Sequence, residues 1–205
     1  MSERTERDEL AGFCRRLWER SLTSGSSGNV SLRLEDGDLL ATPSGRSLAN
    51  LAPNELVRVA PDGTPRDPAQ RVTSELPLHL AAYRVRPDIR CVVHTHPTFS
   101  VVWSKTGRLF ARDTVGAMES LRACAWTPYR KNGTQELAEL CGCEFARGID
   151  LVVMERHGLT AISHDLEDAF VQTELAEEAA KIAYYSAYLP RAAEPSAEPE
   201  NPERS

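Results

Sequence analysis

The chain has 205 residues, of which 41% are hydrophobic and 26% are charged, with a formal net charge of −6. This composition predicts a globular protein with one substantial core. An acidic balance without a lysine and arginine stripe argues against nucleic acid or an anionic membrane as the main partner. No run approaches the ~20 apolar residues that span a bilayer, and the charged residues 1–8 lack the apolar segment of a secretory signal. We therefore expect a cytoplasmic enzyme.

The N-terminal part is expected to form one helix and three strands. Apolar residues recur at helical spacing in segment 5–19, which predicts an amphipathic helix. A glycine/serine loop follows at 24–29. Asp36-Gly37 is typical of a hairpin turn, so the sheet is expected to open with an antiparallel pair. The strands predicted here are 30–34, 39–42 and 57–59.

The middle of the chain is expected to contain two helices and two strands. Ser74 can cap a helix that runs to about Tyr83, and Pro77 is tolerated in its first turn. Residues 107–132 show no clear periodicity apart from a strand near 123–126. The other elements predicted here are a strand over 91–96 and a helix over 98–104.

The C-terminal part again alternates helices with strands. Thr134 is a suitable N-cap for one helix, and a longer helix is predicted from about Asp165 to the stop at Leu189-Pro190. The strands predicted between these helices are 151–154 and 159–162.

The order of these elements predicts the fold class. Helices alternating with strands, after an early hairpin, indicate an α/β fold on a mixed sheet covered by helices. We expect a single catalytic domain over residues 5–190. Residues 191–205 are rich in alanine, glutamate and proline and lack a core-forming pattern, which predicts a disordered tail.

Two histidines at the end of an apolar strand are the strongest functional signal. Side chains on a strand repeat every two residues, so His94 and His96 point the same way. Two imidazoles converging from one face form half of a site for a divalent transition metal. Glu75 and His157 also lie at the ends of predicted elements, where α/β folds place ligands. These four residues can complete a four-coordinate site.

Three segments of small residues accompany this candidate metal site. Each offers hydroxyls or an amide beside backbone N–H groups, which suit a phosphate monoester. Taken singly, each is also explained as a turn or helix cap. Together with a metal site, they suggest a phosphorylated substrate. The segments are Gly28-Asn29, Thr42-Pro43-Ser44-Gly45 and Thr73-Ser74.

Taken in order, these motifs resemble the class II aldolase/adducin family over about residues 5–188. The resemblance implies a three-layer α/β/α sandwich with a central mixed, mainly antiparallel sheet. The motifs that carry it are Gly28-Asn29-Val30-Ser31, Thr42-Pro43-Ser44-Gly45, Ser74-Glu75, His79-x-x-x-Tyr83, Arg86-Pro87-Asp88, His94-Thr95-His96 and His157-Gly158.

The resemblance also implies roles for individual residues. His94, His96, His157 and Glu75 would bind Zn²⁺ or another divalent transition metal, and Glu75 would become the catalytic acid/base once substrate displaces it. The family is commonly a homotetramer with active sites between subunits. The residues matching its phosphate- and substrate-binding positions are Gly28, Asn29, Ser44, Gly45, Thr73 and Ser74.

The implied function is a metal-dependent lyase that acts on a phosphorylated small-molecule carbohydrate. Such an enzyme cleaves a carbon–carbon bond beside the carbonyl through a metal-stabilised enediolate. Aldol cleavage of the fuculose-phosphate type and decarboxylation of a 3-oxo-tetronate 4-phosphate share this intermediate. The aldolases carry a tyrosine some twenty residues beyond the second strand histidine. Residues 111–116 contain none, and the N-terminal part is more similar to the decarboxylases.

Other functions of the same fold stay open. A ribulose-phosphate 4-epimerase is disfavoured because its His-Ala-Asp segment is missing, and a methylthioribulose-phosphate dehydratase would use the same metal. A non-catalytic adducin-like binding module would not need all four metal-type ligands, which this chain retains.

Several other polar residues have competing interpretations. His79 can be a fifth ligand or a neighbour of the ligands, but we favour a packing role because four donors already complete the site. His164 is expected to cap the last helix or face solvent. Arg112 or Arg130 can bind a substrate carboxylate, although surface arginines are the favoured interpretation. The five cysteines are interpreted as reduced thiols.

Overall fold

The computed structural model describes residues 2–189. The predicted tail over 191–205 lies outside these residues, as does Pro190. Among the described residues, no helix combines the length and apolar character needed to cross a bilayer.

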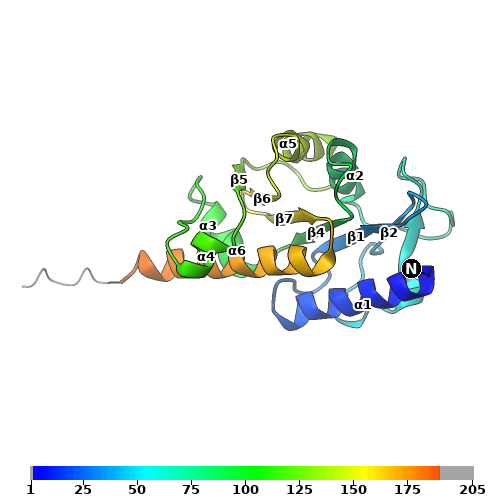
Figure 1. Ribbon diagram of the computed structural model, residues 1–205, viewed down its shortest axis with the longest axis horizontal. Coiled ribbons are helices and arrows are strands. Elements are labelled where there is room, and N and C mark those ends of the chain that lie inside the picture. The colour runs from blue at the N-terminus through cyan, green and yellow to red at the C-terminus, as the bar shows by residue number, and fades with distance from the viewer. Residues whose placement is uncertain (1, 190–205) are drawn as a thin grey trace, which may run out of the picture.

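A seven-stranded mixed sheet forms the middle layer (Figure 1). Its strand order is β3-β2-β1-β4-β7-β6-β5, and neighbouring strands run antiparallel except for the parallel pair β5 and β6. The bounds are β1 (Asn29–Arg33), β2 (Leu39–Ala41), β3 (Val57–Val59), β4 (Cys91–Thr95), β5 (Cys124–Thr127), β6 (Leu151–Met154) and β7 (Gly158–Ser163).

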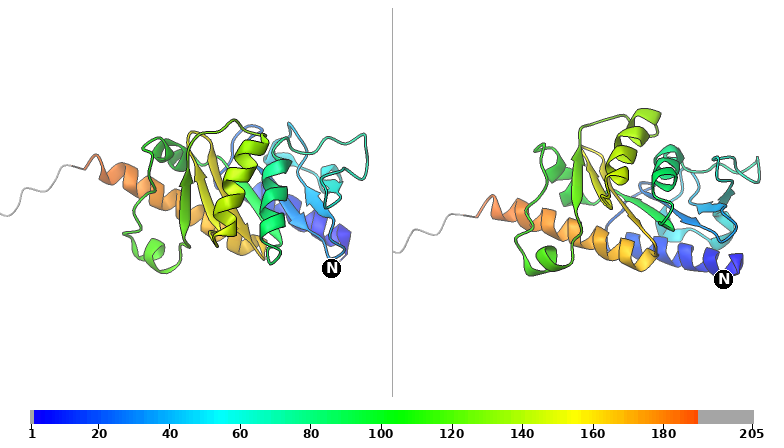
Figure 2. Two further views of the ribbon diagram at one scale, coloured as in Figure 1. Left: turned by 90° about the horizontal axis from the view of Figure 1, so that it is seen from above. Right: turned by 45° about the horizontal axis from the view of Figure 1, so that its top comes forward.

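Helices cover both faces of this sheet (Figures 1 and 2). Helices α2 and α5 pack together on one face, and α1 and α6 lie on the other, where α3 and α4 contact α6. The predicted three-layer sandwich is confirmed. The bounds are α1 (Glu3–Glu19), α2 (Leu76–Val85), α3 (Thr98–Ser104), α4 (Val115–Glu119), α5 (Gln135–Ala146) and α6 (Leu166–Ser186), with short 3₁₀ turns at Leu48–Asn50 and Pro53–Glu55.

The alternation of side chains along β4 decides which face receives the histidines. Cys91 and Val93 pack in the core beneath α1, whereas Val92 packs in the core beneath α2 and α5. His94 has the same parity as Val92 and therefore lies on the α2 side. It pairs in register with Asn29 on β1 and with Thr160 on β7, so it sits in the interior of the sheet.

The predicted cap of α2 is wrong by one residue. Glu75, not Ser74, occupies the N-cap position, and it makes no side-chain capping bond. Thr73 replaces that bond: its hydroxyl accepts from Glu75 N at 3.2 Å and its carbonyl accepts from Leu76 N at 3.2 Å. The Glu75 carboxylate is therefore free to point away from the helix end. Pro77 lies in the first turn, as predicted.

The segment that sequence periodicity left unassigned contains α4. This helix has five residues, too few to show a helical repeat. Thr114 caps it by accepting a hydrogen bond from Ala117 N. The guanidinium of Arg112 donates to the carbonyl oxygens of Ala117 and Leu121, which ties the loop before α4 to the helix and to the segment after it.

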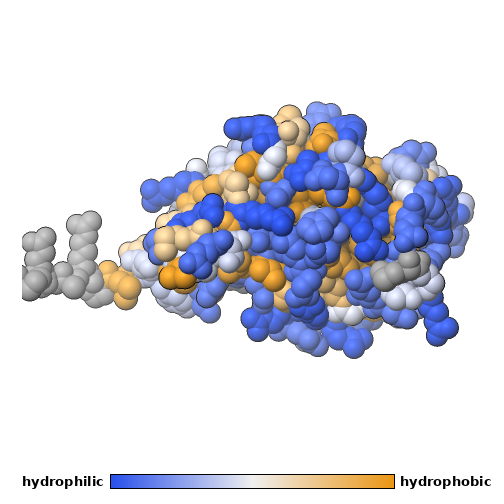
Figure 3. Space-filling view, in the orientation of Figure 1, coloured by the Kyte–Doolittle hydropathy of each residue, from blue (hydrophilic) through white to orange (hydrophobic). Residues whose placement is uncertain are grey.

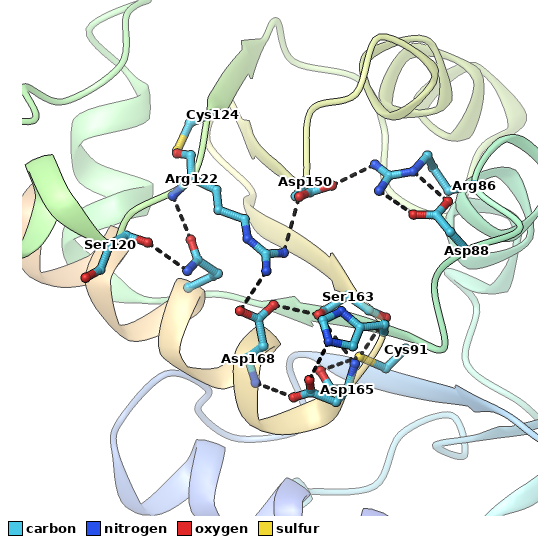
Figure 4. A network of polar contacts seen from close by, with 12 residues as sticks. Arg86, Asp88, Cys91, Ser120, Arg122, Cys124, Asp150, Ser163, Asp165 and Asp168 are labelled. Atoms are coloured by element: carbon cyan, nitrogen blue, oxygen red, sulfur yellow. Dashed lines mark hydrogen bonds and ion pairs between the residues drawn. The ribbon is translucent and has the colours of Figure 1, made fainter.

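A network of charged side chains closes the end of the sheet where β6 begins and β7 ends (Figure 4). Asp150, just before β6, accepts from Arg86 at 2.6 Å and from Arg122 at 3.2 Å. Arg122 also donates to Asp168 on α6 at 2.9 Å. Arg86 donates further to Asp88. We call these five residues the charged clasp.

Candidate metal centre and anion pocket

Three imidazoles and one carboxylate meet at the opposite end of the same strands. His94 and His96 come from the end of β4, His157 comes from the turn between β6 and β7, and Glu75 comes from the start of α2. One donor atom from each of these residues can be chosen so that all lie within 4.8 Å of one another. The structure thus brings together all four residues that the sequence predicted as ligands.

The donor atoms face one another across short distances. The Nε2 atoms of His94 and His96 are 2.8 Å apart. Glu75 Oε2 lies 2.9 Å from His94 Nε2, and Glu75 Oε1 lies 3.2 Å from His157 Nε2. The three rings are mutually edge-to-face, with centroids 4.7 to 5.0 Å apart.

The hydrogen bonds of His94 show which of its nitrogens is available to a metal. Nδ1 lies 3.0 Å from the carbonyl oxygen of Leu159, which can only accept, so Nδ1 carries the proton. In the neutral ring, Nε2 then presents a lone pair to the other donors. A backbone carbonyl behind a histidine is the usual way to orient a metal ligand.

This arrangement needs a cation at its centre. Lone pairs of His94 and His96 and the carboxylate of Glu75 repel one another unless a proton or a metal ion lies between them. Glu75 Oε1 is buried and makes no hydrogen bond with acceptable geometry. A donor set of three imidazoles and a carboxylate suits a divalent transition metal such as zinc. The residues therefore fit a metal ion.

The electrostatics favour a neutral His96 imidazole and an ionised Glu75 carboxylate. Burial, reinforced by His94 and His157, lowers the pKa of His96 to about 3. Burial acts to raise the pKa of Glu75, but the adjacent His94 and His157 outweigh it, and this pKa falls well below its usual range. Neutral imidazole and carboxylate are the protonation states that bind metals.

Gly158 allows the turn that carries His157 to approach β4. A Cβ atom on Gly158 would collide with the carbonyl oxygen of Thr95 and lie 3.1 Å from the His96 ring. A side chain at this position would therefore push His157 and His96 apart. This packing explains why glycine directly follows His157.

A small cavity of about 130 Å³ lies beside the candidate metal centre. The segments around Ser44 and Thr73 are joined by a β-bridge between Pro43 and Val72. Thr73 N donates to Thr42 O, and Ser44 N donates to Arg71 O. These bonds bring together small-residue segments that are far apart in the sequence. The cavity is lined by all six predicted phosphate-site residues, Gly28, Asn29, Ser44, Gly45, Thr73 and Ser74, and also by Glu75 and His96.

Of the remaining lining residues, Pro43 belongs to the predicted segment Thr42-Pro43-Ser44-Gly45. Sequence reasoning did not single out Ser26, Ser27 and Asn132. The two serines belong to the glycine/serine loop, so their composition was a usable signal. Asn132 reaches the cavity from the loop before α5. In this loop, Gly133 (φ +70°) lies against the backbone of Ser74. No local sequence pattern predicts this contact.

Asn29 is placed differently from a simple phosphate ligand. Its amide Nδ2 donates to Glu75 Oε2 at 3.0 Å, and its Oδ1 lies 2.6 Å from His79 Nε2. The side-chain amide of Asn29 is therefore hydrogen-bonded to Glu75 and His79. That Asn29 binds substrate stays a prediction. His79 is fully buried and hydrogen-bonded at both ring nitrogens, and it is absent from the four-residue donor group.

The other residues with competing interpretations lie outside this centre. The side chain of His164 is 70% exposed beside Asp165, which caps α6 in its place. Arg130 pairs with Glu136, and the Arg112 guanidinium is engaged with backbone carbonyls. All five cysteines are free thiols. A larger cavity of about 670 Å³ beside α2 is lined by none of the four residues of the donor cluster.

Comparison with known proteins decides the family. A model of the class II aldolase and adducin N-terminal domain matches residues 8–184. The chain belongs to the class II aldolase and adducin family. The resemblance inferred from the motifs is confirmed.

Members of this family with assigned names align over most of the chain. L-fuculose phosphate aldolase of Methanocaldococcus jannaschii is 30% identical over 177 residues, covering 86% of this chain and 94% of that protein. The 3-oxo-tetronate 4-phosphate decarboxylase of Escherichia coli K12 is 31% identical over 187 residues, covering 89% and 87%.

Solved structures of the family share the fold. The crystal structure of YgbL from Escherichia coli superposes with a TM-score of 0.84 at 31% identity, covering 93% of each chain. L-fuculose 1-phosphate aldolase superposes with a TM-score of 0.77 at 26% identity, covering 93% of this chain and 90% of that one.

Proposed function

We propose that this protein is a metal-dependent lyase that cleaves a carbon–carbon bond beside the carbonyl of a phosphorylated sugar or sugar acid, through an enediolate. The observation that carries the proposal is the position of the four-residue donor cluster directly against a cavity lined by small polar residues. An adducin-like binding module has no need for converging donors beside an anion pocket.

The anion pocket would hold the phosphate through neutral donors. The backbone N–H groups of Ser44 and Thr73 are already bonded, so the side-chain hydroxyls of these residues are the donors they can offer. Thr73 Oγ1 accepts from Glu75 N and still has its own hydrogen to donate. Binding energy from the phosphate would orient the reacting carbons beside Glu75.

His94, His96, His157 and Glu75 would hold the metal, for which zinc is our first choice. When bound, a divalent cation polarises the substrate carbonyl and neutralises the charge that develops on its oxygen.

Glu75 would move the proton. When the carbon–carbon bond breaks, its electron pair passes to the carbon beside the carbonyl and gives the enediolate. Glu75 takes up a proton from water before this step and then delivers it to that carbon. In the reverse direction, the carboxylate removes this proton. Asn29 and the imidazoles keep Glu75 in its ionised form in the absence of substrate.

Aldol cleavage and decarboxylation differ in what leaves. Cleavage of an aldol releases an aldehyde after its hydroxyl loses a proton, whereas decarboxylation releases carbon dioxide and needs no base for a hydroxyl. Relatives of both kinds are about equally similar, with 30% and 31% identity. We therefore propose carbon–carbon cleavage to an enediolate as the shared step. Aldol cleavage and decarboxylation both remain candidate reactions.

We further propose a homotetramer. Large apolar side chains are exposed on α4 and around the end of α6, and Figure 3 shows hydrophobic residues among polar ones in the left half of the molecule, where these helices lie. Burial against a second subunit would remove this area from water. They are Val115, Met118, Tyr185, Tyr188 and Leu189. Light scattering coupled to gel filtration tests the assembly directly.

Proton exchange into dihydroxyacetone phosphate tests the proposed chemistry. Zinc-loaded protein is mixed with this compound in heavy water, and deuterium at the hydroxymethyl carbon is followed by NMR. We expect uptake by the wild type and a loss of about 100-fold or more in Glu75→Gln, because the amide cannot take up the proton.

Control variants separate proton transfer from binding. Ser44→Ala should weaken the affinity for the phosphate while leaving zinc binding intact. If metal-replete wild type shows no uptake, the enediolate lyase proposal is wrong for three-carbon phosphates. Uptake that persists in Glu75→Gln would remove Glu75 from its assigned role.

A further inference from the structure

A chain of buried hydrogen bonds extends behind the candidate metal centre. It begins at Glu75, passes through Asn29 and His79, and ends at Ser31 and Tyr83. Glu75, Asn29, Ser31 and His79 are at most 6% exposed, and Tyr83 is 8% exposed. His79 stands at the centre of this chain with both ring nitrogens bonded.

The hydrogen bonds from Glu75 through Asn29 to His79 allow only one arrangement of protons. Ionised Glu75 can only accept, so Asn29 must present Nδ2 to it. The Oδ1 of Asn29 then faces His79 Nε2 at 2.6 Å, and this oxygen also can only accept. His79 must therefore carry its proton on Nε2.

The hydrogen bonds from His79 to Ser31 and Tyr83 agree with this assignment. With the proton on Nε2, the Nδ1 of neutral His79 is an acceptor, and Ser31 Oγ lies 2.7 Å away as its donor. Because the Ser31 hydroxyl hydrogen points at His79, the 3.0 Å contact between Ser31 Oγ and Tyr83 Oη requires Tyr83 to be its donor. The carbonyl oxygens of Ser31 and Arg90, at 3.0 and 3.3 Å from Tyr83 Oη, compete for the same hydrogen. The links from Glu75 to Ser31 thus each pair one donor with one acceptor. Reversing the Asn29 amide would place donor against donor at His79 and acceptor against acceptor at Glu75.

We propose that His79, as the neutral Nε2–H tautomer, is a positioning residue that holds the Asn29 amide on Glu75 and thereby holds the Glu75 carboxylate at the metal centre. A contribution of His79 to catalysis, through Glu75, rests on the proposed function. The tautomer of His79 and its hold on Asn29 do not. His79 is excluded as a fifth metal ligand because its Nε2 lone pair is replaced by a hydrogen, and Asn29 cannot turn toward substrate without breaking two buried hydrogen bonds.

The tautomer can be measured without metal or substrate. In histidine-labelled wild-type protein, ¹⁵N NMR should show the His79 ring protonated at Nε2 alone, with a hydrogen-bonded Nε2–H. Assignment comes from the loss of this signal in His79→Gln. A ring protonated at Nδ1, or at both nitrogens at pH 7, would overturn the proposal whether or not the protein is a lyase.

Zinc affinity tests whether His79 acts through Asn29. We expect His79→Leu to weaken Zn²⁺ binding about 10-fold in a chelator competition, a typical size for a residue behind a ligand. His79→Gln should recover most of this loss, because its amide can donate from near the position of Nε2. In an Asn29→Ala background, His79→Leu should change the affinity less than about 2-fold, since its partner is already absent.

Leu78→Ala is the matched control for general destabilisation. Leu78 is 2% exposed on the same helix and packs in the core without joining the hydrogen-bonded chain. Its loss should lower the unfolding temperature and leave zinc affinity unchanged. Equal effects of His79→Leu with and without Asn29 would show that His79 has only a packing role. If deuterium exchange is absent in the wild type while the tautomer and the affinity cycle behave as expected, the proposed lyase activity fails and the positioning role stands.

Discussion

The two ends of the central strands treat polar groups in opposite ways. At the end where β6 begins and β7 ends, the charged clasp pairs each arginine with carboxylates on more than one element (Figure 4). At the other end, His94, His96 and Glu75 place acceptors against acceptors. The pair Arg86 and Asp150 at one end and the pair His94 and Glu75 at the other are all at least partly buried, so exposure to water alone does not explain the difference.

This contrast indicates that the charged clasp contributes to stability, whereas the donor cluster is suited to binding a ligand. A satisfied network such as the clasp stabilises the fold and has nothing left to bind. An unsatisfied donor set costs stability, and it persists where a ligand completes it. We therefore expect substitutions at the candidate metal centre to change binding and turnover, and substitutions at the clasp to change stability.

The largest effect is expected from removing a ligand. His94→Ala should weaken Zn²⁺ binding by more than about 100-fold, beyond the range of residues that only support ligands, and should remove deuterium exchange with it. Circular dichroism should show a folded protein. Exposed His164→Ala serves as control and should change neither property. Full zinc occupancy in His94→Ala would falsify the site.

Metal addition should stabilise the wild type. Binding to the folded state at 100 times Kd contributes about 2.7 kcal/mol, which corresponds to a rise in Tm of about 5 to 10 °C for a chain of this size. Differential scanning calorimetry with and without Zn²⁺ measures the shift. No shift is expected in His157→Ala. Equal shifts in both proteins would place the zinc elsewhere.

Substitution in the charged clasp should change stability and leave deuterium exchange almost unchanged. Asp150→Ala removes the acceptor shared by Arg86 and Arg122 and should lower the free energy of unfolding by about 1 to 2 kcal/mol. Deuterium exchange per folded molecule should stay within about 2-fold of wild type. A large loss of turnover at unchanged stability would show that the two ends are coupled.

The smallest effect is expected from acid at the clasp. The hydrogen bond from Arg86 lowers the pKa of Asp88 below its ordinary value of 3.8. Ionised Asp88 therefore stabilises the folded state above about pH 4, and this contribution is lost as the pH falls through the lowered pKa. Because Asp88 is 59% exposed, the contribution should be below about 1 kcal/mol.

Urea unfolding measures this small contribution. Asp88→Asn should be slightly less stable than wild type at pH 7, and the difference should shrink as the pH falls through the lowered pKa of Asp88. A difference that persists unchanged at pH 2 would mean that Asp88 acts through something other than its charge.

Local patterns predicted most elements and the ligands of the centre. Period-two alternation placed His94 and His96 on one face, and β4 does present them together with Glu75 and His157. The same reasoning failed at Ser74, because Thr73 takes over the capping bonds. It also failed at α4, which is too short to show a period.

The role of His79 was beyond local reasoning. A histidine on a buried helix face reads as packing, and its partners Ser31 and Asn29 lie 48 and 50 positions away in the chain. Only the packing of α2 against β1 brings these groups within hydrogen-bond distance. The same holds for Asn132, which lines the small cavity beside the candidate metal centre from a loop without a recognisable pattern.

The sequence alone thus determined the α/β class, the elements with clear periodicity and the four donor residues. These depend on interactions between near neighbours, such as strand alternation, helix spacing and turn residues. The tertiary structure decided which acceptors face one another without compensation, which polar groups are saturated in the clasp, and where Asn29 points. Those outcomes depend on contacts between distant segments, which exist only after the helices have packed on the sheet.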